Sequence, residues 1–385
     1  MMTTISDPRV WPSPTSAEPF ATLHWLAEES LAAATAAEAS RHDEAIGSLL
    51  RAALDNRDGA ALAAIFESAP SSPIYRHLWR ELSRAEAMSD AGATAVTVFA
   101  LPLTILAGRE NDDGASVTLP CVLRDASEIA RLLREHGALE GNEAFVLANT
   151  LVSTDAIDIR NLPSIHAWRE VSDDSIERMK EPRAFAPAPI VVGAQDARVH
   201  LRFIVGAAIA ARGADLVAGH GIGRWAMPLT RLLGRALAHE GVTLLILPQA
   251  PKRLCAAVQQ GRAAQREVSA QLFASNALRN FRASVGEPVA VISAHRAPDA
   301  ASGGELRVSL SSPLDPSQAE GYRCPLYRAD QPNDVAEMLV TLLRDCRVGD
   351  IRVLPGVHED RDPATGLRLM FKADALDAPP SLAIQ

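Results

Sequence analysis

Residues 219–247 have the sequence GHGIGRWAMPLTRLLGRALAHEGVTLLIL. Three glycines form a turn, leucines recur at helical spacing after Trp225, and the apolar run from Val242 to Leu247 is typical of a buried strand. A further short strand, Asp215 to Ala218, is expected before the turn. This alternation of strand, turn, helix and strand favours an α/β fold with a largely parallel sheet and right-handed crossovers.

The sequence pattern changes several times along the 385 residues. Near the N-terminus, apolar residues such as Ile46, Leu50 and Leu54 recur at helical spacing, whereas the pattern is typical of strands from Ala93 onward. We therefore predict a flexible N-terminus (1–17), an α-helical region (18–92), a β-β-α-β unit (93–163), a proline-bearing linker (164–189), an α/β domain (190–376) and a flexible tail (377–385).

Two long stretches of the α/β domain are expected to be helical. The apolar segment from Ala197 to Arg212 predicts a buried helix, and Arg253 to Val285 predicts a helical stretch with a break at Gly261. The order strand, strand, helix, strand recurs between Pro288 and Leu354. We interpret this as a second β-β-α-β unit and therefore as an internal repeat.

The segment from Gly219 to Arg282 is basic within an acidic chain. It carries nine Arg and Lys side chains against Glu240 and Glu267, a net charge of +7, whereas the whole chain has a formal net charge of −9. Such a separation of charge orients an acidic partner or the chain's own acidic surface. Our favoured hypothesis is a non-catalytic interaction or assembly protein, which docks an acidic protein partner or self-associates through Arg224, Arg231, Arg235, Lys252, Arg253, Arg262 and Arg266.

Nucleic acid is a less favoured partner for the same residues. Arg224, Arg231 and Arg235 share one helix face, because they stand at i, i+7 and i+11. However, nucleic-acid-binding domains are usually basic overall and expose aromatic side chains for stacking on bases. This chain is acidic, only 4% of it is aromatic, and Trp225 and Phe273 fit core positions.

The glycine turn supports a second hypothesis, an enzyme or ligand-binding protein, because a helix N-terminus after such a turn attracts phosphate. Gly221 to Gly241 resembles the opening of a short-chain dehydrogenase, where a Gly-Ile-Gly turn leads into an alanine-rich helix, and the resemblance implies a dinucleotide at the turn. The glycines stand at positions 1, 3 and 5 in place of 1, 3 and 6, and no tyrosine has a lysine four residues later. We therefore expect no cofactor.

The other part of this second hypothesis is the segment Ser293 to Asp299, at the end of an expected strand. It resembles a loop of the purine-biosynthetic carboxyaminoimidazole ribonucleotide mutases, whose histidine serves in proton transfer, and the resemblance implies this role for His295. If both segments lie at neighbouring strand ends, a phosphate-bearing small molecule or nucleotide binds between them. Its ligands would be Gly219, His220, Gly221, Gly223, Arg224, His295 and Arg296.

Metal, disulfide and membrane chemistry are not indicated. His358, Glu359 and Asp360 are consecutive on a turn and point in different directions, so we expect a solvated acidic turn and no metal. The cysteines form no Cys-x-x-Cys pair, and the longest apolar run, Phe203 to Ala211, is far short of the ~20 residues that span a bilayer. We therefore expect a cytoplasmic protein without a membrane span. Arginine outnumbers lysine 35 to 3 and alanine is abundant, which is typical of a GC-rich bacterial genome.

Overall fold

The computed structural model describes residues 19–88, 95–109, 116–139, 144–166, 185, 188–193, 197–210, 221–284, 287–295, 304–312 and 319–358. The chain divides into two compact units. The first comprises Met1–Ser89 with Ile159–Ala167, and the second comprises Asp90–Asp158 with Trp168–Gln385. The first unit is helical, and all strands of the described residues lie in the second.

The first unit consists of α1 (Pro19–Ala32), α2 (Ala36–Asp55), α3 (Gly59–Glu67), α4 (Ser72–Met88) and the short α6 (Leu162–His166). Thr35 caps the N-terminus of α2, and its side-chain oxygen accepts a hydrogen bond from the Glu38 N–H. The returning α6 is held by a buried pair, in which His166 Nε2 lies 2.7 Å from Glu86 Oε1. This pair fixes a segment that is distant in sequence to α4.

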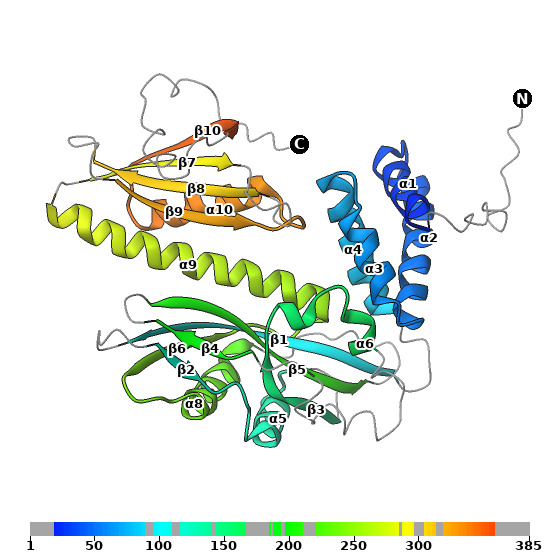
Figure 1. Cartoon of the computed structure of the whole chain (residues 1–385), viewed down its shortest axis with the longest axis horizontal. Helices are drawn as coiled ribbons and strands as arrows, with labels where there is room; N and C mark the ends of the chain where they lie inside the picture. The colour runs from blue at the N-terminus through cyan, green and yellow to red at the C-terminus, as the bar shows by residue number, and fades with distance from the viewer. Residues whose placement is uncertain are drawn as a thin grey trace, which may run out of the picture. The chain divides into compact units, whose positions relative to one another are not determined.

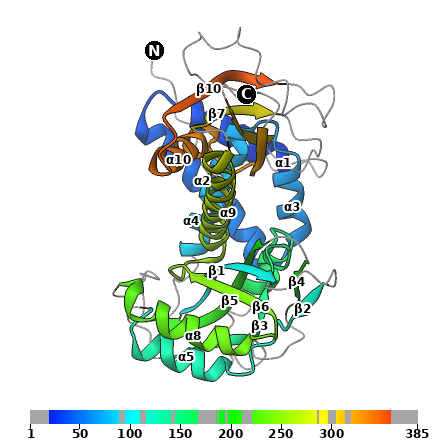
Figure 2. The same cartoon turned by 90° about the vertical axis from the view of Figure 1, so that its left-hand side faces the viewer.

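The N-terminal sheet has the strand order β3-β5-β1-β6. β1 spans Ala95–Arg109, β3 spans Ala144–Val152, β5 spans Arg198–Ala210 and β6 spans Val242–Pro248. α5 (Ala126–Glu135) and α8 (Ala226–Ala236) cover one face and enclose an apolar core against it, and α9 (Leu254–Ser284) packs on β1 and β5 from the other side (Figures 1 and 2). A small separate sheet pairs β2 (Val117–Leu119) with β4 (Ile190–Val192).

The C-terminal sheet has the order β10-β7-β8-β9. β7 spans Val289–His295, β8 spans Gly304–Ser311, β9 spans Ala319–Leu326 and β10 spans Asp350–His358. One face carries small and apolar residues such as Ala290, Ile292 and Leu306, which pack on the C-terminal part of α9 and on α10 (Pro332–Asp345). α9 therefore contributes to the cores of both sheets.

The prediction of a largely parallel sheet is wrong. Every pairing in the N-terminal sheet is antiparallel, and in the C-terminal sheet only β10 and β7 are parallel. β5 and β6, which flank the glycine turn, do not pair with each other because β1 lies between them. The strand expected at Asp215 to Ala218 lies outside the described residues.

The helix predicted from Ala197 to Arg212 is also wrong, since Arg198–Ala210 forms β5. β5 is a central strand between β3 and β1, and both of its faces are covered in its second half. A strand buried on both faces has a continuous apolar sequence without alternation, and this sequence cannot be told from a buried helix by periodicity.

α9 is continuous through Gly261, where the sequence predicted a break. A Cβ at this position would lie 2.8 Å from Leu201 Cδ1 and 3.1 Å from Pro102 Cβ. The glycine therefore permits close approach of α9 to β5 and β1.

The two predicted β-β-α-β segments differ in strand pairing. In the first, β1 pairs with β5 and β6, while β2 belongs to the separate small sheet. In the second, β7 pairs directly with β8 and with β10, and β9, which the sequence analysis did not identify, extends the sheet.

Candidate functional site

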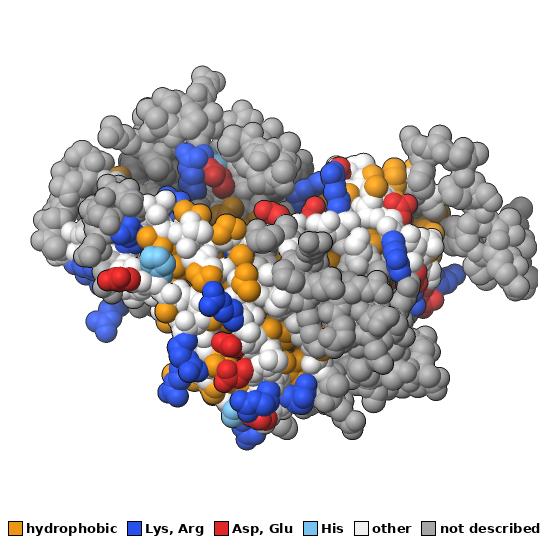
Figure 3. Space-filling model, turned by 60° about the horizontal axis from the view of Figure 1, so that its bottom comes forward, with side chains coloured by type: hydrophobic (Ala, Val, Ile, Leu, Met, Phe, Trp, Pro, Cys, Tyr) orange, Lys and Arg blue, Asp and Glu red, His pale blue; other side chains and the backbone are white. Residues whose placement is uncertain are grey.

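The most distinctive surface of the second unit is the outer side of α8. Leu229 and Leu233 are fully buried beneath this helix, and they fix its opposite side toward solvent. The exposed side presents Arg224, from the short 3₁₀ turn Ile222–Arg224, followed by Met227, Arg231 and Arg235. We call these four residues the α8 stripe. Figure 3 turns this face forward and shows Lys and Arg side chains beside hydrophobic ones.

The arginines of the α8 stripe make no ion pair within the described residues. α8 itself contains no carboxylate, and its first turn has no acidic residue. Met227 is 58% exposed, more than any other large hydrophobic side chain in the described part of the chain. The stripe therefore combines three positive charges that no described carboxylate pairs with and one accessible apolar side chain.

The arginines of α5, which packs beside α8, have partners within the protein. Arg131 Nη1 donates to Glu135 Oε1 at 2.8 Å, and this hydrogen bond raises the pKa of Arg131. Arg134 lies over the ring of Phe145, with its Cζ 5.3 Å from the ring centroid, and donates a hydrogen bond to the backbone carbonyl oxygen of Phe145. The charges of α5 are thus satisfied within the protein.

The other four residues predicted to dock the partner differ in their exposure. Lys252 is exposed, and Arg253 is half-buried at the start of α9. Arg262 lies over the ring of Tyr327, with its Cζ 4.2 Å from the ring centroid, and the buried Arg266 forms an ion pair with Asp330 at 2.9 Å. Arg262 and Arg266 therefore fix the segment after β9 to α9 and do not belong to an exposed surface.

The glycine turn does not enclose a ligand-sized space in the part that the structure describes. Gly219 and His220 lie outside the described residues. Gly221 has a φ of +37°, and a Cβ added at Gly221 or Gly223 would meet no atom within 4 Å. The following 3₁₀ turn has only three residues and is exposed, so it offers little of the helix N-terminus that a phosphate site needs.

His295 ends β7, and Arg296 lies outside the described residues. The Oγ of Ser293 lies 2.7 Å from His295 Nε2, and the His358 ring centroid lies 5.7 Å from that of His295. Ser293 is 0% exposed, so a substrate has no access to its hydroxyl in this structure. β7 belongs to the C-terminal sheet, whereas the strand after the glycine turn, β6, belongs to the N-terminal sheet, so the two segments do not end neighbouring strands.

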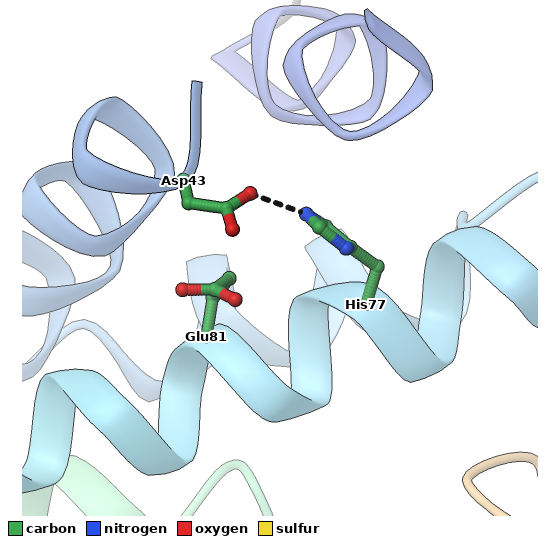
Figure 4. A group of neighbouring side chains, drawn as sticks. All are labelled: Asp43, His77 and Glu81. Atoms are coloured by element: carbon green, nitrogen blue, oxygen red, sulfur yellow. Dashed lines mark ion pairs between the residues drawn. The ribbon is translucent and has the colours of Figure 1, made fainter. Parts of the chain in front are cut away.

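Asp43 of α2 and His77 and Glu81 of α4 form a cluster that the sequence analysis missed (Figure 4). Their ligand atoms lie within 4.8 Å of one another, and His77 Nε2 is 3.0 Å from Asp43 Oδ1. His77 and Glu81 stand at i and i+4 on one helix face, which was the only sequence signal. The contribution of Asp43 depends on the packing of α2 on α4 and is not visible in the sequence.

Arginines already supply the positive charge of this cluster. Arg84 Nη1 lies 2.7 Å from Glu81 Oε1 and 3.5 Å from Asp43 Oδ2. Arg80 Nη2 lies 2.7 Å from His77 Nδ1, and because a guanidinium only donates, Nδ1 must accept. Burial, followed by the charge of Arg80, lowers the pKa of His77, so the ring is neutral and carries its proton on Nε2.

The protonated Nε2 faces the carboxylates, and a metal requires an unprotonated nitrogen at that position. The cluster is therefore best described as an ion-pair network that joins α2 to α4.

No helix among the described residues combines the length and the apolar character that crossing a bilayer requires. Comparison with known proteins gives no match to this chain, whether with family models, curated proteins or solved structures, so the functional argument rests on its own geometry.

Proposed function

We propose that this chain is a non-catalytic interaction protein that docks an acidic protein partner through the α8 stripe. The observation that carries the proposal is the set of three exposed arginines, Arg231 and Arg235 one turn apart on α8 and Arg224 in the 3₁₀ turn before it, which lack an ion pair among the described residues. Exposed charges of one sign steer association with a partner of the opposite sign and set its orientation.

The apolar groups beside the arginines favour a protein partner over nucleic acid. Met227 is 58% and Ile222 44% exposed, and arginine and methionine are enriched at protein interfaces. Nucleic-acid surfaces instead use exposed aromatic rings for stacking. Trp225, next to the stripe, is 1% exposed and belongs to the core, so it cannot serve in this way.

The partner can be trapped with a photoreactive residue. We would place p-benzoylphenylalanine at Met227 and, as a matched control on α5, at the exposed Ser127, and irradiate cells of the source organism that express each variant. The proposal predicts a discrete protein adduct at position 227 that is absent at position 127. A nucleic-acid adduct, or the absence of any adduct, would contradict it.

Charge reversal then tests the arginines themselves. The double substitution Arg231→Glu and Arg235→Glu should weaken binding of the trapped partner by more than about tenfold, which corresponds to about 1.4 kcal/mol. Arg131→Glu on α5 is the control and should change the affinity by less than about twofold. Since each change is at the surface, we expect unfolding free energies to shift by only about 0.5 kcal/mol per substitution. Equal affinities for the two variants would refute the assignment of the stripe.

A further inference from the structure

β6 is the last strand at one end of the N-terminal sheet, as far as the described residues show. β6 pairs with β1 on one side, and no described strand pairs with its other side. An exposed strand edge offers a row of backbone N–H and C=O groups for pairing with another chain. Proteins usually protect such an edge with charged side chains, a bulge or a covering segment.

Within the described part of the chain, β6 shows none of these protective features along its length. Its sequence, VTLLILP, contains no charged residue, and its proline stands only at the end. Leu245, at the middle of the strand, is 49% exposed. Val242, Leu244 and Ile246 face the α8 core, while Leu245 and Leu247 point to the other face of the sheet. A strand added at this edge would therefore meet apolar side chains on both faces.

The opposite edge of the same sheet is covered. Next to β3, the Leu123 N–H donates to the Asn149 carbonyl at 2.5 Å, and the Leu151 N–H donates to the Cys121 carbonyl at 2.7 Å. An isolated bridge joins Val122 to Thr150. The fold therefore provides its own covering segment for β3, whereas the described residues provide none for β6.

Opposite charges stand at the two ends of the open edge. Glu240 lies just before β6, and Lys252 lies beyond its end, where its backbone still pairs with Ala100 of β1. Both side chains are exposed, and neither forms an ion pair in the described part of the chain. If an antiparallel copy of the strand were added, Glu240 of one copy would approach Lys252 of the other, at both ends of the pair.

We infer that a second copy of this chain pairs with β6, antiparallel and around a two-fold axis, so that one continuous sheet runs through both copies. The strand is suited to its own copy because the interface is the same patch on both sides, apolar in the middle and with complementary charges at its ends. This surface is separate from the α8 stripe. The inference therefore goes beyond the docking of an acidic partner.

The mass of the full chain in solution tests the inference. Light scattering with size-exclusion chromatography should give twice the chain mass of 41.0 kDa for the wild type, falling on dilution. Leu245→Lys places a charge on the edge and should give a monomer at every concentration. Val191→Lys is the matched control, since Val191 is 48% exposed on β4, and it should remain dimeric. A wild type that is monomeric throughout, or a dimeric Leu245→Lys, overturns the inference.

A cysteine scan keeps the test decisive if Leu245→Lys fails to fold. In a Cys346→Ser background, where Cys121, Cys255 and Cys324 are buried, single cysteines are placed at Leu244, Leu245 and Ile246. The two-fold axis puts one residue opposite its own copy, with Cα atoms about 4.5–5.5 Å apart, a separation that a disulfide spans. Cross-linking at one position and not at its neighbours supports the pairing, whereas no cross-linking, or equal cross-linking at all three, overturns it.

The α8 stripe variants separate the two surfaces. Arg231→Glu with Arg235→Glu should remain dimeric even when partner binding is lost, and Leu245→Lys should keep its affinity for the partner. If the charge reversal also abolishes the dimer, self-association proceeds through the stripe and the β6 inference fails.

Discussion

The two ends of the N-terminal sheet are built alike, each with a helix packed on its outer strand, α5 on β3 and α8 on β6. They differ in how many of their charges and backbone groups have partners among the described residues. On one side, α5 packs on β3, its Arg131 is bonded to Glu135, and the edge of β3 is covered by residues 121–123. On the other side, α8 packs on β6, the arginines of the stripe lack ion pairs in the described structure, and no described strand covers the edge. Both helices bury leucines against the same core.

This difference supports the proposal that the molecule meets other molecules on the α8–β6 side. Among the described residues, arginines without ion pairs, an exposed methionine and a strand edge without a partner occur together on the α8–β6 side. On the α5–β3 side, the arginines of α5 and the edge of β3 have internal partners, although Val122 is also exposed. A folded chain gains little stability from a group of exposed arginines or from a strand edge without a partner. Their concentration on one side is explained if contacts with other molecules complete that side.

The largest change in stability is expected from the core residues that α5 and α8 contribute in the same way. Leu133 of α5 is 1% exposed and Leu233 of α8 is 0% exposed, and both contribute to one core. Leu133→Ala and Leu233→Ala should each lower the free energy of unfolding by about 2–5 kcal/mol, because each leaves a cavity of the same kind. Urea unfolding of both variants measures this. If Leu233→Ala lowered the free energy of unfolding several times less than Leu133→Ala, α8 would be more weakly packed than α5, and the two ends of the sheet would not be comparable.

The fold was partly visible in the sequence. Strands such as β6 and β7 and the helices α5, α8 and α10 follow from their periodicity, because each has one buried and one exposed side or a short apolar run between turns. The direction of the strands was not visible. The sequence between β5 and β6 has the length and pattern of a parallel crossover, but β1, from far earlier in the chain, lies between these strands. Such pairing between distant segments leaves no local signal.

The candidate site was predictable in the same limited way. The position of Arg231 and Arg235 on one face of α8 follows from helical spacing, whereas Arg224, predicted on the same face, lies in the 3₁₀ turn before the helix. The structure exposes all three. Arg262 and Arg266 were predicted with the same weight, because charge alone does not reveal that Tyr327 and Asp330 lie against them. The exposure of Met227 and the open edge of β6 depend on what the rest of the chain leaves uncovered.

A smaller change in stability is expected from a substitution that gives α8 an acidic partner for its arginine, as α5 has. Met227→Glu places a carboxylate four residues before Arg231, in the first turn of α8, where no acidic residue stands at present. The new pair should stabilise the protein by about 0.3–0.5 kcal/mol. It should also weaken binding of the acidic partner, because it neutralises one arginine of the stripe. Met227→Gln removes the methionine without adding charge, and equal binding by the two variants would show that the charge of Arg231 does not matter.

The smallest effect is expected from the reverse change, which makes α5 resemble α8. Glu135→Gln removes the carboxylate that accepts the Arg131 hydrogen bond at 2.8 Å, and both side chains are more than half exposed. An exposed pair contributes little, so the midpoint of urea unfolding should fall by about a tenth of the Leu133→Ala effect or less. Partner affinity should stay unchanged, because one released arginine on α5 lacks the neighbouring positive charges and the exposed methionine of the α8 stripe. If Glu135→Gln instead strengthens binding, the partner responds to total charge on this face, and the distinction between the two helices has no functional meaning.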